Sequence, residues 1–108
     1  GKPLAEFQLT QAKLADMATN IAAARLLVYQ AASKLAKGEK CTLEASMAKS
    51  LASRIANKAC YDAVQIHGGN GFVREFPVER YFRDARVTEI YEGTTEIQSL
   101  IIAREVLG

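Results

Sequence analysis

Hydrophobic residues in the first third of the chain recur at steps of three and four, which is the repeat of one face of an α-helix. The stripe comprises Leu14, Met17, Ala18, Ile21, Ala24, Val28, Ala32 and Leu35. Lys34 and Lys37 followed by Gly38 are typical of a helix end, because cations are favoured near the last carbonyls and glycine tolerates a positive φ. This pattern predicts one long helix from about Gln8 to Lys37.

A second hydrophobic ridge steps by four residues each time and predicts another long helix over residues 42–66. The ridge comprises Leu43, Met47, Leu51, Ile55, Ala59 and Ala63. A row of small residues lies beside it (Ala48, Ala52 and Ala56) and would let another helix approach closely. Thr42 is the expected N-cap of this helix, and the glycines at 68 and 69 are expected to end it. A short loop joins the two long helices, so we expect them to be antiparallel.

A loop and a short helix are predicted next. Residues 67–76 predict the loop, in which Asn70-Gly71 is a strong turn signal because both residues tolerate left-handed backbone conformations. Pro77 suits the first position of a short helix over residues 78–86.

The last part of the chain predicts an irregular segment and a final helix. Residues 87–93 are expected to be irregular or extended. Thr95 and Gln98 fit a capping box that opens the final helix, with Thr94 as the alternative cap. Nothing in the sequence alternates convincingly as a strand. The predicted fold class is therefore all-α, with two long antiparallel helices and two short ones.

The composition is that of one ordinary globular domain, with 108 residues, 49% hydrophobic residues and a net charge of +2. So small a positive excess does not argue for nucleic acid or an anionic membrane as a partner. No run approaches the roughly 20 apolar residues of a membrane-spanning helix, and we expect no signal peptide. Cys41 and Cys60 form neither a disulfide framework nor a metal-ligand pattern. The long helices carry more apolar surface than so short a chain can cover, so we expect self-association or a missing partner domain.

Glu92 is the strongest candidate for chemistry, because it is a lone carboxylate in a short irregular segment beside apolar Ile90 and Tyr91. Partial burial there would raise its pKa and make it a stronger proton acceptor. The adjacent Gly93 would let a substrate approach backbone N–H groups that could bind a developing oxyanion. The alternative is a loop glutamate whose charge favours the N-terminus of the following helix.

Two other clusters have simpler interpretations. The loop His67-Gly68-Gly69-Asn70-Gly71 could bind an anion through exposed N–H groups, but it follows a helix and lacks the spacing of a dinucleotide or P-loop motif. A turn that ends the helix is the alternative, with His67 as a structural residue. A basic cluster with interleaved acidic residues predicts an ion-paired helix face rather than a nucleic-acid surface. Its arginines are Arg74, Arg80, Arg83 and Arg86.

Three motifs then follow one another in a characteristic order. They are Gln65-Ile66-His67-Gly68-Gly69-Asn70-Gly71-Phe72, then Arg83-Asp84-Ala85-Arg86, then Ile90-Tyr91-Glu92-Gly93-Thr94 with Glu96-Ile97-Gln98 and Ile102-Ala103-Arg104. Together they resemble the C-terminal helical domain of acyl-CoA dehydrogenases. Gly1-Lys2-Pro3-Leu4 with Phe7-Gln8 also fits that family, so the resemblance covers essentially the whole chain.

The resemblance implies that residues 1–108 are one domain of a larger flavoprotein, which also has an N-terminal helical domain and a middle β-domain and usually forms a homotetramer. Family members oxidise an acyl-CoA to trans-2-enoyl-CoA, and electron-transferring flavoprotein reoxidises their FAD. The motif assigns Glu92 as the base that removes the α-proton, with its backbone N–H donating to the thioester carbonyl, and Gly93 as the residue that meets the substrate. The compartment implied is the mitochondrial matrix in a eukaryote or the cytoplasm in a bacterium.

The resemblance also assigns two stretches to FAD. Gln65, Ile66, His67, Gly68 and Gly69 match the stretch that contacts the diphosphate and adenine of FAD held by a neighbouring subunit. Thr94, Thr95 and Glu96 match the stretch that touches FAD in the same subunit, at a helix start where anions are favoured.

The chain departs from the family pattern in what it lacks. An arginine and an aromatic residue that help hold FAD would precede its first residue, as would the first helix of the bundle and the whole β-domain. We therefore expect this chain alone to be inactive and to bind FAD weakly. Isovaleryl and long-chain branches place the base on that earlier helix, and Glu92 argues against those branches. The rival function is a non-catalytic helical oligomerisation module that keeps the family fold.

Overall fold

The computed structural model describes all 108 residues and is entirely helical. Its helices are α1 (Gln8–Ala36), α2 (Thr42–His67), α3 (Val78–Ala85) and α4 (Thr95–Leu107). Three short 3₁₀ turns accompany them: η1 (Leu4–Glu6), η2 (Gly68–Phe72) and η3 (Arg86–Glu89). The predicted all-α fold, with two long helices and two short ones, is confirmed.

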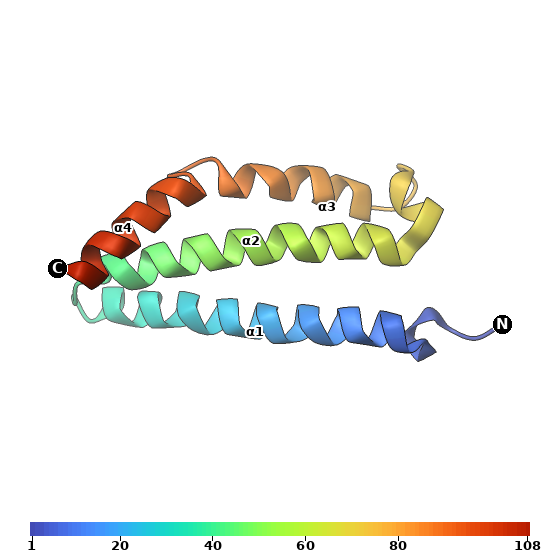
Figure 1. Cartoon of the computed structure of the whole chain (residues 1–108), viewed down its shortest axis with the longest axis horizontal. Helices are drawn as coiled ribbons and strands as arrows, with labels where there is room; N and C mark the ends of the chain where they lie inside the picture. The colour runs from blue at the N-terminus through green and yellow to red at the C-terminus, as the bar shows by residue number, and fades with distance from the viewer.

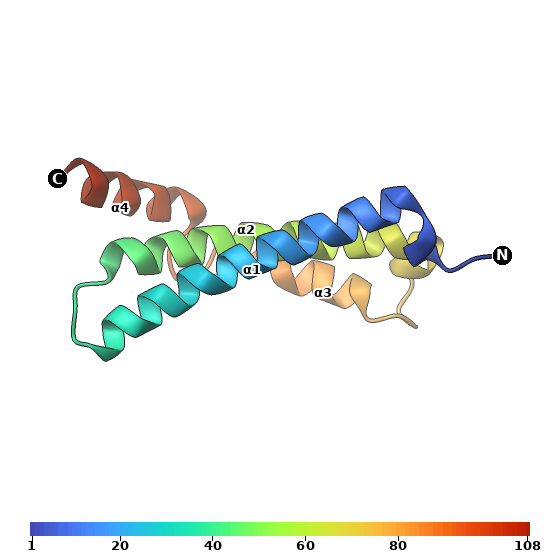
Figure 2. The same ribbon diagram turned by 90° about the horizontal axis from the view of Figure 1, so that it is seen from below.

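The helix α2 is the centre of the fold, because each of the other three helices packs against it. Figures 1 and 2 show α1 running antiparallel to α2, as the short connecting loop predicted. In Figure 1, α3 lies beside the C-terminal half of α2 and α4 near its N-terminal end. The segment that joins α3 to α4 therefore runs along α2, and this segment contains Glu92.

Two cap assignments differ from the sequence-based expectation. Cys41, not Thr42, is the N-cap of α2, because the Cys41 carbonyl already accepts the first helical bond, from the N–H of Ala45 at 2.9 Å. At α4 the alternative cap is the one observed: the Thr94 hydroxyl accepts from the N–H of Ile97 at 3.2 Å. In both places the cap lies one residue earlier than the expected cap, because the preceding loop determines which residue keeps non-helical dihedrals.

The molecule is elongated and has almost no core of its own. Its radius of gyration is 16.7 Å, against about 13 Å for a compact domain of this length. Its accessible surface is 7599 Å², against about 5,900 Å² for a compact monomer of this mass. Ala24 and Ala48 are the only buried hydrophobic residues, and no large side chain is fully buried.

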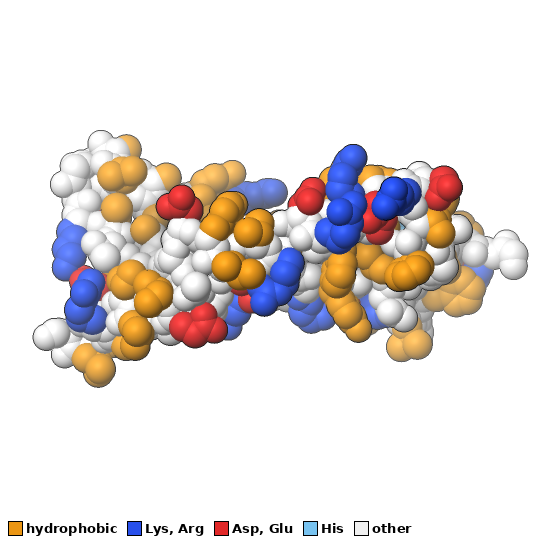
Figure 3. All heavy atoms as spheres, turned by 90° about the horizontal axis from the view of Figure 1, so that it is seen from above, with side chains coloured by type: hydrophobic (Ala, Val, Ile, Leu, Met, Phe, Trp, Pro, Cys, Tyr) orange, Lys and Arg blue, Asp and Glu red, His pale blue; other side chains and the backbone are white.

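The exposed apolar faces that the sequence predicted are present. On α1 alone, the side chains of Leu9, Leu26, Tyr29 and Leu35 are each more than half exposed. Figure 3 shows hydrophobic side chains in patches along the length of the face seen there. A soluble monomer rarely leaves so much apolar surface in contact with water, so these faces fit contacts with further protein.

Gly71 is the one buried glycine of the loop after α2, and its packing leads to a stability prediction. An added Cβ would overlap the carbonyl oxygen of Val64, and this backbone atom cannot rotate away. We expect Gly71→Ala to lower the free energy of unfolding by about 1–3 kcal/mol, measured by denaturant titration. Gly69→Ala is the matched control, since a Cβ at Gly69 meets nothing within 4 Å. Equal losses in the two variants would contradict this packing.

An ion pair between Lys34 and Glu44 ties the end of α1 to the first turn of α2. The hydrogen bond from Lys34 lowers the pKa of the Glu44 carboxyl below its ordinary value. A lowered pKa in the folded state means that the pair stabilises the protein above the unfolded glutamate pKa of about 4.3 and that this stabilisation is lost as the pH falls through the folded value. When the pH falls from about 7 to about 3, we expect the Tm of Glu44→Gln to decrease less than the Tm of the unmodified protein.

The control for this titration is Glu6→Gln, because Glu6 is exposed and makes no side-chain hydrogen bond or ion pair. It should follow the pH dependence of the unmodified protein. If Glu44→Gln also follows it, the ion pair does not contribute to acid sensitivity.

Candidate functional site

The chain turns sharply at Glu92 and Gly93, between η3 and α4. Glu92 has φ 53° and is the only non-glycine residue with a positive φ. Gly93 follows with φ 92°, a value beyond the range that residues with a side chain adopt easily. A left-handed glutamate costs about 1–3 kcal/mol, so other contacts must hold this turn in place.

Two side chains from different helices hold the turn. Lys49 Nζ of α2 donates to the Gly93 carbonyl at 2.6 Å. Gln98 Nε2 of α4 lies 3.4 Å from the carbonyls of both Glu92 and Gly93, and the Gln98 side chain is buried. A Cβ at Gly93 would lie 2.5 Å from Gln98 Nε2, so the end of the Gln98 side chain would have to shift to make room for it. The φ of Gly93 therefore favours glycine, and any side chain there would also displace Gln98.

The start of the segment that carries Glu92 is also tied to α2. Asn57 Nδ2 donates to the Ala85 carbonyl at 2.9 Å and to Thr88 Oγ1 at 3.3 Å. Thr88 Oγ1 in turn donates to the Ala85 carbonyl at 2.6 Å. Asn57 and Lys49 lie about 12 Å apart along the axis of α2, so one helix anchors both ends of residues 85–93.

The residues of this chain do not bury Glu92. Its side chain is exposed, and neighbouring Ile90 and Tyr91 are each 52% exposed. The expected partial burial of Glu92 is therefore wrong for this chain by itself, because its apolar neighbours also face solvent at the surface turn. A hollow of about 300 Å³ opens beside the turn, lined by Lys49, Ala52, Ser53, Ala56, Thr88 and Tyr91. The arrangement leaves an accessible carboxylate with apolar surface next to it.

The first turn of α4 follows directly and carries the second predicted FAD stretch, Thr94 to Glu96. The N–H groups of Thr95 and Glu96 lie where a helix supplies no carbonyl partner, so they are available as donors. The carboxylate of Glu96 is exposed in the same turn. Backbone donors at a helix start suit a phosphate or another anion.

The other predicted FAD stretch, Gln65 to Gly69, ends α2. Gly68 has φ 59° and ψ −138°, a conformation that favours glycine, and a Cβ at Gly68 or Gly69 would meet nothing within 4 Å. This open backbone fits the close approach of a diphosphate group. His67 makes its contacts within the chain: Nδ1 lies 2.8 Å from the Ala63 carbonyl, and the ring lies edge-on to Phe76 at 6.2 Å.

The structure does not bring these two stretches together. Lys49, which holds the Glu92 turn, lies about 27 Å along α2 from His67, where the glycine turn begins. Figure 1 shows the loop after α2 at one end of that helix, with the α3–α4 connection well back toward the other end. The two stretches of one copy therefore do not form a single compact site.

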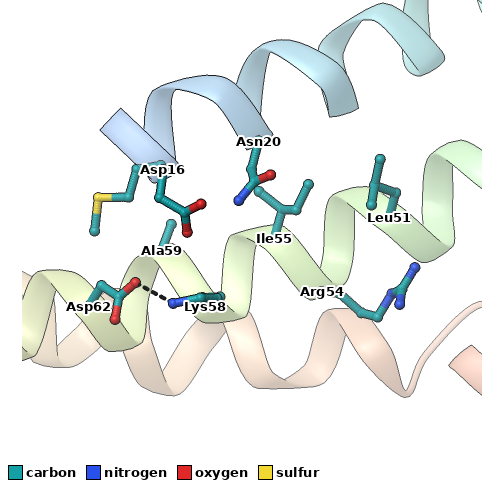
Figure 4. A pocket seen from close by; sticks show the side chains of 9 residues that line it. Asp16, Asn20, Leu51, Arg54, Ile55, Lys58, Ala59 and Asp62 are labelled. Atoms are coloured by element: carbon teal, nitrogen blue, oxygen red, sulfur yellow. Dashed lines mark hydrogen bonds and ion pairs between the residues drawn. The ribbon is translucent and has the colours of Figure 1, made fainter. Parts of the chain in front are cut away.

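A polar crevice between α1 and α2 was not predicted. Figure 4 shows Asp16 and Asn20 of α1 opposite Lys58 and Asp62 of α2, around a hollow of about 190 Å³. Lys58 Nζ lies 2.7 Å from Asp62 Oδ2, and this hydrogen bond raises the pKa of Lys58. The four-residue spacing of Lys58 and Asp62 was the available signal. Lys58 and Asp62 are four residues apart on α2, so this ion pair lies within one helix and neutralises the buried Asp62 carboxylate. We therefore assign no reactive role to the crevice.

The remaining candidate groups have structural explanations. Arg83 pairs with Glu79 at 2.8 Å, as expected for an ion-paired helix face. Both cysteines are free, and burial raises the pKa of the Cys60 thiol, which keeps it protonated. No three His, Cys, Asp or Glu side chains gather as metal ligands would, and none of the helices is long and apolar enough to cross a membrane.

Sequence reasoning named Glu92, Gly93 and the glycine turn as candidates, and it did not name Lys49 or Asn57, which hold the Glu92 segment. Both lie on α2 among small residues, and nothing in a helix pattern shows which distant carbonyl a polar side chain will reach. A polar residue beside the alanine row was the only available signal.

Comparison with known proteins identifies the family. The family described as "Acyl-CoA dehydrogenase, C-terminal domain" matches residues 1–107. An acyl-CoA dehydrogenase of Bacillus subtilis is 57% identical over 108 residues, which is the whole of this chain and 28% of that protein. Subunit CarC of the caffeyl-CoA reductase–Etf complex of Acetobacterium woodii is 51% identical over 107 residues, or 99% of this chain and 28% of that subunit.

The structural comparison agrees. The butyryl-CoA dehydrogenase structure from Megasphaera elsdenii superposes with a TM-score of 0.98 and 48% identity, covering all of this chain and 28% of that one. The chain thus spans little more than a quarter of the length of these relatives. The chain belongs to the acyl-CoA dehydrogenase family and has the fold of its C-terminal helical domain.

Proposed function

We propose that this chain is the C-terminal helical domain of an FAD-dependent acyl-CoA dehydrogenase in which Glu92 is the catalytic base. The observation that carries the proposal is the left-handed Glu92, held between Gly93 and two anchoring side chains. Strained residues of this kind persist where the surrounding structure over-determines them, and they cluster at active sites. A glutamate that served only to favour a helix start would need no such conformation.

The carboxylate of Glu92 takes the α-proton of the bound thioester, breaking the carbon–hydrogen bond and forming an oxygen–hydrogen bond. The backbone N–H of Glu92 donates to the thioester carbonyl, where negative charge develops as the proton leaves. Gly93 lets the substrate approach the backbone. Bound FAD supplies the acceptor for the hydride that leaves the β-carbon, so that the product is trans-2-enoyl-CoA.

Two copies of the chain contribute to each flavin in this proposal. Thr94 to Glu96 serve the flavin of their own subunit, and Gln65 to Gly69 serve that of a neighbour. The separation of about 27 Å along α2 supports this division, because one copy does not bring both stretches together. The exposed apolar faces supply the surface for a homotetramer and for the missing domains, which would also exclude water from Glu92.

The reaction partner is an acyl-CoA, and electron-transferring flavoprotein is the proposed electron acceptor. The relative named for an Etf complex supports that partner. That relative is named a reductase, whereas the Bacillus subtilis relative is named a dehydrogenase. Glu92 can serve either direction, because the residue that removes the α-proton in oxidation returns it in reduction. The proposed compartment is the mitochondrial matrix or the bacterial cytoplasm.

Purified full-length protein tests the proposal. We expect a yellow oligomer with about one FAD per subunit, whose flavin absorbance bleaches when a short-chain acyl-CoA is added without oxygen. The rival function, a non-catalytic oligomerisation module, predicts a colourless oligomer. A yellow protein that no acyl-CoA bleaches would contradict the proposed reaction.

A further inference from the structure

We infer that Lys49 is a positioning residue for proton abstraction, because it fixes the peptide that follows Glu92. The inference rests on the proposed function of Glu92. Lys49 Nζ lies 2.6 Å from the Gly93 carbonyl oxygen and reaches it across 44 positions of sequence. The contact therefore joins the central helix α2 directly to the reactive turn.

The partner of Lys49 is unusual among the lysines of this chain. Lys34, Lys40 and Lys58 each pair with a carboxylate. The ammonium of Lys49 instead bonds a neutral backbone carbonyl, and it makes no ion pair. A hydrogen bond from a charged donor is about twice as strong as one between neutral groups, so this contact can hold a strained peptide in a single orientation.

Gln98, the second side chain that holds the turn, makes longer and therefore weaker hydrogen bonds than Lys49. Gln98 Nε2 lies 3.4 Å from the carbonyls of Glu92 and Gly93, at the long end of the hydrogen-bond range. Without Lys49, the left-handed Glu92 and Gly93 would depend on these two long contacts. The turn would then sample other conformations, and the carboxylate would spend less time in line with the α-proton.

Lys49→Met in the full-length flavin-loaded enzyme tests the inference. Methionine keeps an unbranched side chain of similar volume but removes the ammonium. We expect the rate constant of flavin bleaching at saturating acyl-CoA to fall roughly 10- to 100-fold, because misplacement of a reacting group has effects of this size. FAD content per subunit should not change. Lys49→Arg keeps a charged donor and should recover part of the rate.

The kinetic isotope effect separates positioning from a purely structural role. A variant with fewer folded molecules loses bleaching amplitude, but its rate constant and isotope effect do not change. A displaced carboxylate makes proton abstraction slower, so the slower bleaching of Lys49→Met should show an isotope effect with α-deuterated acyl-CoA at least as large as that of the unmodified enzyme. An unchanged rate constant, or a slower rate whose isotope effect is lost, would overturn the inference. If Lys49→Met does not retain flavin, Lys49→Gln, which keeps only a shorter neutral donor, is expected to show the same slower step.

Lys58→Met is the matched control, since Lys58 lies on the same helix and loses an ion pair with Asp62 instead of the turn contact. Its bleaching rate should equal that of the unmodified enzyme, and an equal loss in both variants would overturn the inference. Glu92→Gln, measured in parallel, distinguishes a failure of the proposed function from a failure of the role of Lys49. Normal bleaching in Glu92→Gln would contradict the proposed function of Glu92. Loss of bleaching in Glu92→Gln, with a normal rate in Lys49→Met, would contradict only the role of Lys49.

Discussion

Glu92→Gln in the full-length enzyme is expected to keep FAD bound and to lose its bleaching by acyl-CoA, with a rate constant lower by roughly 10²- to 10⁴-fold. The amide has nearly the size of the carboxylate but cannot accept a proton. The Glu92 side chain is exposed and makes no hydrogen bond within the chain, so the substitution disturbs no contact that holds the turn. Flavin absorbance after rapid anaerobic mixing with substrate measures the effect.

Glu89→Gln is the control for this variant, because Glu89 lies three residues away and its side chain makes no ion pair. It should bleach at the rate of the unmodified enzyme. Bleaching of Glu92→Gln at that same rate would identify Glu92 as a loop glutamate at the start of α4, the alternative that the sequence left open.

Gly93→Ala is expected to have the second large effect, on both stability and rate. Alanine at φ 92° is strained, and its Cβ would lie 2.5 Å from Gln98 Nε2. The buried Gln98 amide would have to move and lose its contacts with the turn. We expect the free energy of unfolding to fall by about 2–4 kcal/mol, and flavin bleaching to slow as the turn shifts.

The comparison with Gly38→Ala separates the cost of backbone strain at a positive φ from the cost of displacing Gln98. Gly38 has φ 72°, but a Cβ there meets nothing within 4 Å. Its substitution should cost only the backbone strain, about 1 kcal/mol, with no change in the bleaching rate. Denaturant titration of both variants gives the difference. Equal losses would mean that the contact between Gly93 and Gln98 contributes nothing.

The four helices could be predicted from sequence because helical periodicity is a local property. The expected ends of the long helices lie within one residue of those observed, and Gly38 has the positive φ expected after α1. The caps could not be assigned from periodicity alone. Two threonines stand side by side at the start of α4, and the incoming turn decides that Thr94 accepts the bond from Ile97.

The candidate site shows the same division. Glu92 and Gly93 were named from the motif around them, because a carboxylate beside a glycine before a helix can be recognised in the sequence. The left-handed conformation of Glu92 and its exposure in this chain could not be predicted from the sequence. They follow from how the α3–α4 connection lies along α2, which Asn57 and Lys49 determine through contacts with distant residues.

By itself, the amino-acid sequence determined the helices and the absence of a self-sufficient core, and it named the residues that we propose carry the chemistry. These properties depend on spacing and residue type over a few turns of chain. Only the tertiary structure decided which lysine reaches the turn at Glu92 and Gly93 and that the two predicted flavin stretches lie far apart on one copy. Those facts depend on contacts between residues tens of positions apart, and local propensity contains no information about such contacts.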